Sequence, residues 1–189
     1  MAIRNIVLEG DPILKKKCRE VVNFDAKLET LVEDMIDTLK KAKGLGLAAP
    51  QVGIMRRLCI VLAVPNPMDY YNTDEDFDDE EYDEEDFDDE EYDEEDDEIE
   101  GEFIEFINPE ILSTEGSITF QEGCLSYPGR TVIVTRPLKA TVRAFDRYGK
   151  EFTCTLDGIN ARCICHECNH LDGITIEELD EGEEALEKK

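Results

Sequence analysis

Positive charge is scarce in this sequence. Its 189 residues include 20 lysines and arginines against 48 aspartates and glutamates, which gives a formal net charge of −28. That imbalance argues against nucleic acid or an anionic membrane as a partner held by charge. Long apolar runs are also missing: none approaches the roughly 20 residues that span a bilayer, and none near the start has signal-peptide length. We therefore expect a cytoplasmic protein that binds neither membranes nor nucleic acid directly.

Histidine is nearly absent, with two residues, and tryptophan is absent. The seven cysteines are an odd number in a chain long enough to fold without covalent cross-links, so a complete disulfide framework is not expected. We expect the thiols to be free or bound to metal. The length fits one domain over residues 1–189 rather than two.

The excess of acid is concentrated in one segment. Residues 74–100 hold 22 acidic residues and no basic one, while the other 162 residues carry 26 acidic and 20 basic residues. Asp76–Glu85 is repeated letter for letter as Asp86–Glu95. Such a segment buries too little apolar surface to fold alone, so we expect a solvated low-complexity loop at about 69–101. The functional alternatives are a polyanion that binds divalent cations loosely, repels ribosomal RNA or contacts a basic partner.

Apolar spacing predicts one helix and two strands in the first half of the chain. Apolar residues recur at helical spacing from Leu28, with Asp25 as a plausible N-cap and Gly44 after the last periodic residue, which predicts a helix from about 26 to 43. Short branched apolar runs predict strands at 58–64 and 103–107, the second ended by Asn108 and Pro109. The acidic loop would connect these two strands.

The second half of the chain predicts an antiparallel hairpin followed by a helix. A strand is expected at 117–120, and alternating patterns at 138–145 and 152–156 flank the turn residues 146–149. A second helix should run from about 158 to 171 and end before Gly173. The expected fold class is α+β, with antiparallel sheets and two main helices, and the acidic tail is left unassigned.

Both histidines of the chain lie in the sequence His166-Glu167-Cys168-Asn169-His170, an HExxH pattern on the second predicted helix. Residues four apart share a helix face, so both imidazoles can reach one metal ion. Glu167 would stand beside that ion and exchange a proton with its water. This is the geometry of a metallohydrolase. The alternative is that a short pattern arose by chance on a polar helix face.

A catalytic metal of this kind normally takes a third protein ligand. Without a third histidine the candidates are a carboxylate or a thiolate, and Cys124 lies in a glycine-flanked turn after the strand at 117–120. A small buried apolar role is the commoner fate of a free cysteine. Cys165 and Cys168 would face away from the histidine stripe, and Cys163 would pack beside the site. A separate structural zinc site built on these cysteines is the alternative.

Three stretches together resemble the signature motifs of the peptide deformylases in order and spacing. They are GLGLAAPQ at 44–51, EGCLS at 122–126 and HECNH at 166–170. The resemblance extends to GDPIL at 10–14, NPE at 108–110 and HLDG at 170–173. It therefore covers nearly the whole chain except the acidic insert and the tail, and it implies one catalytic domain interrupted by that insert.

The resemblance implies removal of the formyl group from the N-terminal formylmethionine of newly made proteins. Glu167 would take a proton from water and return it to the leaving amine. The Gln51 side-chain amide and the backbone N–H of Leu125 would stabilise the oxyanion. The implied site residues are Cys124, His166 and His170 for the metal, Glu167, Gln51 and Leu125 for catalysis, and Gly44, Gly46 and Leu47 for substrate binding.

The resemblance suggests Fe(II) as the cellular metal, with Ni(II), Co(II) or Zn(II) able to substitute. It implies formylmethionyl nascent peptides as substrates and the ribosome near its exit tunnel as a partner, although the acidic tail argues against basic docking there. Asn169 stands where family members commonly carry Asp. It lies between the metal ligands without being one, so we expect little chemical consequence.

Three other functions compete with this interpretation. A zinc endopeptidase would need a downstream third ligand, for which only carboxylates such as Glu177 and Glu178 are available. An acidic calcium-buffering module would leave Gln51 unexplained, and the insert lacks the spacing of a calcium loop. A deformylase-like fold that has lost its activity is the third alternative, although every expected catalytic residue is present.

Overall fold

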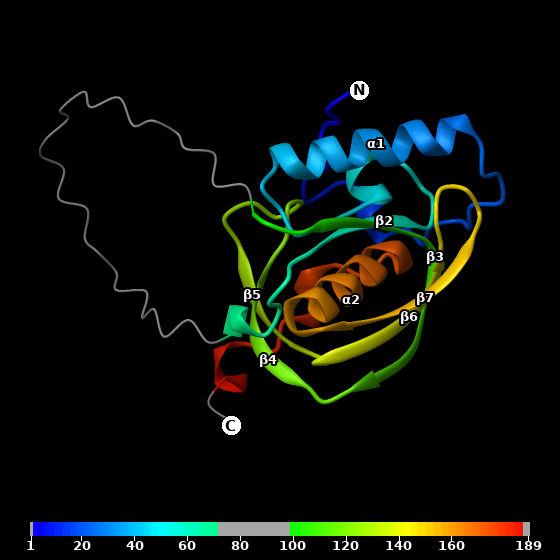
Figure 1. The fold of residues 1–189 in the computed structure, drawn as a ribbon. Helices are drawn as coiled ribbons and strands as arrows, with labels where there is room; N and C mark the ends of the chain where they lie inside the picture. Colours follow the sequence, from blue (N-terminus) through cyan, green and yellow to red (C-terminus); the bar gives the residue numbers. More distant parts are fainter. Residues whose placement is uncertain (1, 72–98, 187–189) are drawn as a thin grey trace, which may run out of the picture.

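The computed structural model describes residues 2–71 and 99–186. Its fold is α+β, as predicted, with two long helices, a five-stranded and a two-stranded antiparallel sheet, and short 3₁₀ helices. Figure 1 shows helix α2 enclosed by the strands, with α1 on the outside of the sheet. The expected solvated conformation of the acidic loop falls mainly on residues 72–98, outside the described residues. Within the described residues, no helix combines the length and apolar character needed to cross a membrane.

Helix α1, Ala26–Lys41, agrees with the predicted helix to within two residues. Its first turn is capped by Asp25, whose side chain accepts hydrogen bonds from the backbone N–H groups of Lys27 and Leu28. The apolar stripe is buried against the outer side of the sheet; its buried apolar members are Leu28, Leu31, Val32, Met35 and Leu39. The apolar periodicity of the sequence therefore corresponds to a helix that buries one face in the core.

Strand β2, Leu58–Ala63, separates two hydrophobic cores. Leu58 and Ile60 pack in the core beneath α1, whereas Cys59 and Val61 pack in the core that contains α2. Successive side chains of a strand point to opposite faces, so a strand covered on both sides reads as a continuous apolar run. Its antiparallel neighbour β1, Gly46–Ala48, was not predicted as a strand.

Strand β3 is longer than the sequence predicts. It runs from Glu102 to Glu115 and does not end at Asn108 and Pro109. The pairing with strand β6, Lys139–Phe145, shifts register between Ile107 and Glu110, and Asn108 takes a φ of 51° there. This bulge accommodates a residue with positive φ and a proline without an N–H donor. The Asn108 side chain accepts from the Val21 N–H at 2.8 Å and donates to the Val21 carbonyl at 2.9 Å, which holds the bulge in place.

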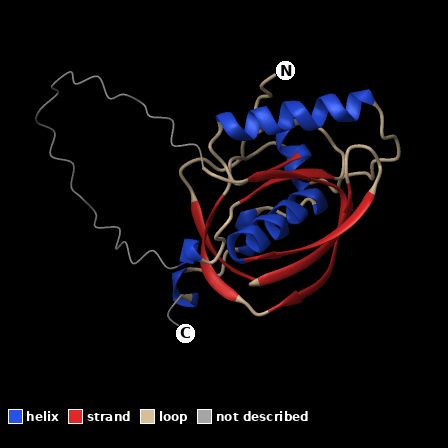
Figure 2. Ribbon diagram, viewed as in Figure 1, coloured by secondary structure: helices blue, strands red, loops and turns tan. Residues whose placement is uncertain are grey.

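The predicted hairpin is present as β6, Lys139–Phe145, and β7, Glu151–Asp157. It completes the five-stranded sheet, whose order is β1-β2-β3-β6-β7 with every neighbouring pair antiparallel. Figure 2 shows how the strands of this sheet curve around the central helix. The sheet therefore supplies a rigid support for α2.

The second sheet consists of β4, Ile118–Gly123, and β5, Thr131–Arg136. Only the first part of β4 was predicted, and β5 was not. The unassigned tail lies along β5: the Glu181 N–H donates to the Ile133 carbonyl at 2.8 Å, and the Ile133 N–H donates to the Asp180 carboxylate at 3.1 Å. The tail thereby covers one edge of this sheet.

Helix α2, Gly158–Asp172, agrees with the second predicted helix and is almost entirely buried. It ends at Gly173, whose φ of 77° is the left-handed conformation that glycine tolerates. Packing on several sides explains why this helix lacks an exposed polar face. The described 3₁₀ helices are Pro12–Lys15, Ala49–Val52, Asp69–Tyr71, Ile176–Leu179 and Glu183–Ala185.

Candidate metal centre and active-site cleft

Three metal-ligating side chains meet where α2 faces the turn after β4. His166 and His170 are one helical turn apart on α2, and Cys124 follows directly after Gly123. The Nε2 atoms of the two imidazoles are 3.1 Å apart, and the Cys124 Sγ lies 3.2 Å from the His170 Nε2. All three donor atoms lie within 4.8 Å of one another. The structure thus brings together the two histidines and the cysteine that the sequence nominates.

This donor set fits a divalent transition-metal ion. Two nitrogen ligands at 2.0–2.1 Å from a tetrahedral ion are separated by about 3.3 Å, close to the observed spacing of the imidazoles. Thiolate and imidazole donors suit iron, nickel, cobalt or zinc rather than calcium or magnesium. With three protein ligands, a tetrahedral ion keeps one position for water or substrate.

A buried carboxylate orients the first histidine. Glu122 Oε1 is 2.6 Å from the His166 Nδ1, so the Nε2 of this ring is directed at the other two donors. Arg136 donates two hydrogen bonds to Glu122, at 3.0 and 2.6 Å, and Arg162 donates a third at 2.8 Å. Burial alone would raise the pKa of Glu122, but hydrogen bonds with His166 and Arg136 hold it well below its usual value. The carboxylate therefore stays ionised.

The surroundings of His166 and His170 stabilise one positive charge. Burial disfavours charge on His166, yet hydrogen bonds with Cys124 and Glu122 raise its pKa to about 10. Burial and the neighbouring His166 lower the pKa of His170 well below its usual value. One cationic charge is thus favoured among these donors and a second is not.

Glu167 lies beside the donor triad and against β1. It is buried, and its Oε2 atom has no hydrogen-bond partner among the described residues. Burial raises the pKa of Glu167 to about 7. A Cβ atom at Gly46 would collide with the Glu167 Oε1 and come within 2.6 Å of the Cys163 Sγ. Glycine at position 46 is therefore required for β1 to approach this carboxylate.

Two hydrogen-bond donors face the same site. The Gln51 Oε1 accepts from the Ala48 N–H at 2.8 Å, which directs the Nε2 toward Cys124 Sγ at 3.5 Å and Ser126 Oγ at 3.3 Å. The backbone N–H of Leu125 has no acceptor within the described parts of the chain. The Gln51 Nε2 therefore lies beside Cys124, and Leu125 borders the same cleft.

A cleft of about 500 Å³ opens over this site. Gly44 and Gly46 line one side, and β4 with the turn after it lines another. Leu47 does not line the cleft: its side chain is fully buried in the core beneath α1, so it cannot contact a ligand there. The three residues predicted to act in catalysis, Gln51, Leu125 and Glu167, all border the cleft.

Several residues that line this cleft were not nominated from the sequence, among them Tyr70, Ile159 and Arg162. Ile159 and Arg162 occupy the turns of α2 that precede His166, and helical periodicity could have placed them near the metal motif. Tyr70 belongs to the 3₁₀ helix at the edge of the acidic insert, and no local sequence signal connects it with the site.

The other cysteines do not form a second metal site. Cys165 and Cys168 pack in the core around α2, and Cys163 borders the cleft beside Glu167. Across residues 2–71 and 99–186, the only cluster of three or more His, Cys, Asp or Glu donors that could hold a metal is the triad. Glu177 and Glu178, the carboxylates that an endopeptidase could use as a third ligand, do not belong to this cluster among the described residues.

Comparisons with known proteins agree with this geometry. The sequence model of the polypeptide deformylase family matches residues 3–184. A curated peptide deformylase from Lachnoclostridium phytofermentans is 41% identical over 184 residues, which covers 97% of this chain and 92% of that protein.

Two solved structures share the fold. The peptide deformylase of Thermotoga maritima superimposes with a TM-score of 0.74 at 28% identity, covering 96% of this chain and 100% of that one. The peptide deformylase of Legionella pneumophila gives a TM-score of 0.71 at 36% identity, covering 95% and 88%. The likeness therefore extends over the whole of both folds.

Proposed function

We propose, from the premise that this chain belongs to the polypeptide deformylase family, that Cys124, His166 and His170 hold its catalytic metal ion. The activity of the family is hydrolysis of the formyl amide at the N-terminal formylmethionine of nascent peptides, and this chain is a hydrolase of that kind. The observation that carries the assignment of residues is the convergence of the three donor atoms beside Glu167.

A divalent ion in this site supplies a Lewis acid that lowers the pKa of a bound water molecule. Cys124 contributes an anionic ligand, and Glu122 fixes the His166 ring through its Nδ1. These side chains are positioned by regular elements: the two histidines lie on the buried helix α2, and Cys124 follows β4 directly.

Glu167 acts as the proton carrier. Its unpartnered Oε2 is the atom that receives the proton from the attacking water. The same carboxyl then gives the proton to the amine nitrogen as the C–N bond of the formyl amide breaks. Gly46 keeps the carboxylate in place, because β1 packs directly against it.

Gln51 and Leu125 stabilise the charge that develops on the formyl oxygen. The Gln51 Nε2 is already oriented by the bond between its Oε1 and Ala48, so little reorganisation is needed when it donates. The Leu125 N–H supplies the second donor. Gly44 and Gly46 let the substrate backbone approach β1, where the peptide can pair as an added strand.

The cellular setting extends this proposal. We infer Fe(II) as the native metal, with Ni(II), Co(II) or Zn(II) as substitutes, since thiolate and imidazole ligands bind all four of these ions. The substrates place the enzyme in the cytoplasm beside the ribosomal exit tunnel.

The test is release of formate from a short formylmethionyl peptide. Protein purified without oxygen is loaded in parallel with Fe(II), Ni(II), Co(II) or Zn(II), and Glu167→Gln serves as the blank. We expect metal-dependent turnover in the wild type and a loss of at least about a hundredfold in the variant, with one metal equivalent bound in both. Equal turnover in the variant would remove Glu167 from the mechanism.

A further inference from the structure

The chain that leads into the acidic insert is fastened to the first turn of α2. We call residues 64–71 the entry segment. The Asn160 side chain accepts from the Val64 N–H and donates to the Val64 carbonyl, both at 3.0 Å. The Ile159 N–H donates to the Pro67 carbonyl, also at 3.0 Å. The entry segment therefore moves with the helix that carries the metal ligands.

Gly158 makes this attachment close. Its φ of 51° is a conformation that side-chain-bearing residues rarely adopt, and a Cβ there would come within 2.6 Å of the Pro67 carbonyl carbon. A residue with a side chain at position 158 would therefore collide with the entry segment. The contacts of Ile159 and Asn160 with this segment constrain the aromatic residues at its end.

Those residues are Tyr70 and Tyr71, and they differ in what they contact. The Tyr71 ring packs edge-on against Phe120 with centroids 5.2 Å apart, and its hydroxyl accepts a hydrogen bond from the Arg162 Nε at 3.3 Å. Tyr70 is held by the same Phe120 ring at 6.0 Å, but it remains 46% exposed and borders the cleft. Tyr71 is thus an anchor, whereas Tyr70 presents an apolar ring to the cleft.

The direction of α2 relates the position of Tyr70 to that of the proposed metal centre. A helix rises 1.5 Å per residue, so Arg162 and Ile159 lie about 6 and 10 Å from His166 along the axis. Tyr70 shares the cleft with both residues, on the side of the metal centre toward the N-terminus of α2. The side chain nearest to the formyl group is that of the formylated residue. A long unbranched side chain that extends in this direction along the cleft would run toward Tyr70, which borders the same cleft.

We propose that Tyr70 is a specificity-determining residue that packs against the end of the side chain of the formylated residue. This inference rests on the proposed deformylase function. The entry segment then has a second role besides connecting β2 to the insert: it forms the outer wall of the substrate side-chain pocket. Long unbranched side chains gain contact with this wall, and short ones do not reach it.

The test compares three formyl tripeptides that differ only in the first side chain: methionine, norleucine or 2-aminobutyrate. Formate release gives kcat/KM for wild type, Tyr70→Ala, Tyr70→Phe and Tyr148→Ala, the last being an exposed tyrosine of the β6–β7 turn. We expect Tyr70→Ala to lower kcat/KM about fivefold for methionine and norleucine and to leave 2-aminobutyrate unchanged. Tyr70→Phe and Tyr148→Ala should match the wild type.

An equal loss for all three peptides, or no loss for any, would overturn the role of Tyr70. Metal content and the melting temperature are measured for each variant, and Tyr70→Leu replaces Tyr70→Ala if the alanine variant does not fold. Wild-type protein that holds one metal equivalent and releases no formate from any peptide would instead overturn the proposed function.

Discussion

Two carboxylate–arginine clusters show how the same pair of groups serves different ends in this chain. In the α2 region, Glu122 is 6% exposed and bonds to Arg136, Arg162 and His166. Near the β6–β7 turn, Glu105 is 16% exposed and forms two short bonds, at 2.9 and 3.0 Å, with Arg147 alone. Only the first cluster extends to a residue of the donor triad.

The two clusters differ in which charged groups would be left unpaired if the glutamate were removed. Removing Glu105 frees one arginine that can turn toward water. Removing Glu122 leaves two guanidinium groups enclosed, with side chains 7% and 3% exposed, and a histidine without its orienting partner. Buried charges that lose their counter-charge are among the most destabilising defects in proteins. Glu→Gln substitutions at buried and exposed sites therefore measure how burial changes the contribution of a carboxylate to the free energy of unfolding.

The largest effect is expected from Glu122→Gln. We expect the free energy of unfolding to fall by about 3–5 kcal/mol, because Arg136 and Arg162 become unpaired inside the protein. Metal affinity should also fall tenfold to about a hundredfold, since His166 loses its anionic partner. Urea denaturation and competition with a chelator measure the two quantities. Unchanged metal affinity would show that Glu122 serves stability alone.

A smaller effect is expected from Glu105→Gln. We expect a loss of about 1 kcal/mol in the free energy of unfolding and no change in metal affinity. Burial would raise the pKa of Glu105, but hydrogen bonding to Arg147 holds it below its usual value of 4.5. The stabilisation is therefore present above about pH 4.5 and disappears as the pH falls through the lowered pKa. Denaturation of the wild type and variant between pH 3 and 7 should converge at the acid end.

Asn169→Asp sharpens the comparison in the opposite direction. Asn169 accepts a hydrogen bond from the Arg136 Nη1, in a cluster where two arginines face one glutamate. A carboxylate there should raise the free energy of unfolding by about 1 kcal/mol at neutral pH, because it adds the missing negative charge. Thermal denaturation at pH 7 gives the sign. Destabilisation would mean that desolvating the new charge costs more than its pairing returns.

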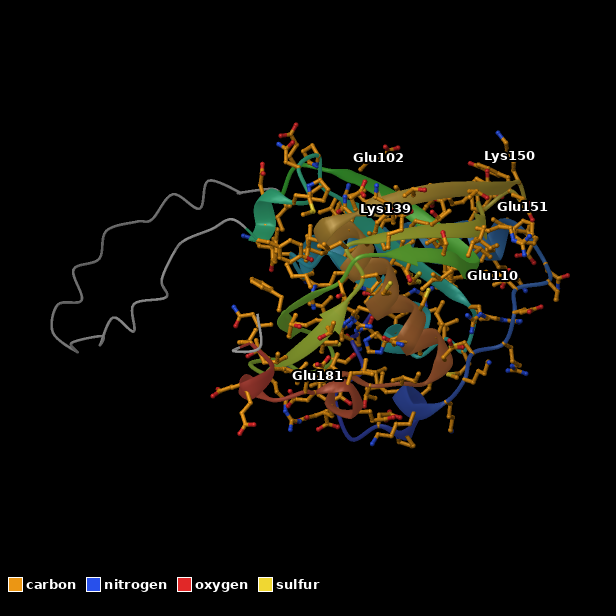
Figure 3. All side chains as sticks on the ribbon, turned by 90° about the horizontal axis from the view of Figure 1, so that it is seen from below. Glu102, Glu110, Lys139, Lys150, Glu151 and Glu181 are labelled. Carbon is orange, nitrogen blue, oxygen red and sulfur yellow. The ribbon has the colours of Figure 1, made fainter. Side chains whose placement is uncertain are left out.

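The smallest effect is expected at the surface pair of Glu110 and Arg143. Their side chains are 59% and 44% exposed, and Glu110, labelled in Figure 3, lies opposite Arg143 on the neighbouring strands β3 and β6. Solvent and salt screen such pairs, so Glu110→Gln should leave the free energy of unfolding within experimental error. A loss as large as that of Glu105→Gln would break the proposed dependence on burial.

The sequence could predict those elements whose pattern is set by local burial. Helix α1 has one buried face, so its apolar stripe marks its length, and β2 is covered on both faces, so it reads as an apolar run. The three residues of β1 were interpreted as part of a loop, because the glycines of that stretch also suit a helix terminus. Strand β3 continues past Pro109 because a bulge and the Asn108 side chain accommodate the missing donor.

The residues of the candidate site also divide into those with a local sequence signal and those placed by contacts between distant segments. The spacing of His166 and His170 predicts a shared helix face, whereas the place of Cys124 depends on how β4 packs against α2. The need for a third ligand made Cys124 a candidate and the motif resemblance selected it, but Glu122 and Tyr70 were not singled out. The partners of Glu122 come from β5 and α2, and Tyr70 reaches the cleft only because Asn160 fastens the entry segment. Contacts between distant segments leave no periodic signal in a single sequence.

The tail along β5 has a consequence for self-association. An unpaired strand edge can template pairing with another copy of the chain and so promote aggregation. Asp180 and Glu181 occupy the backbone groups of β5 on the side away from β4, with acidic side chains that also discourage a second chain. In the part of the chain that the structure describes, the other edge of this sheet is that of β4, whose residues border the cleft. The edge of this sheet that remains for an incoming strand is therefore the one that borders the candidate active-site cleft.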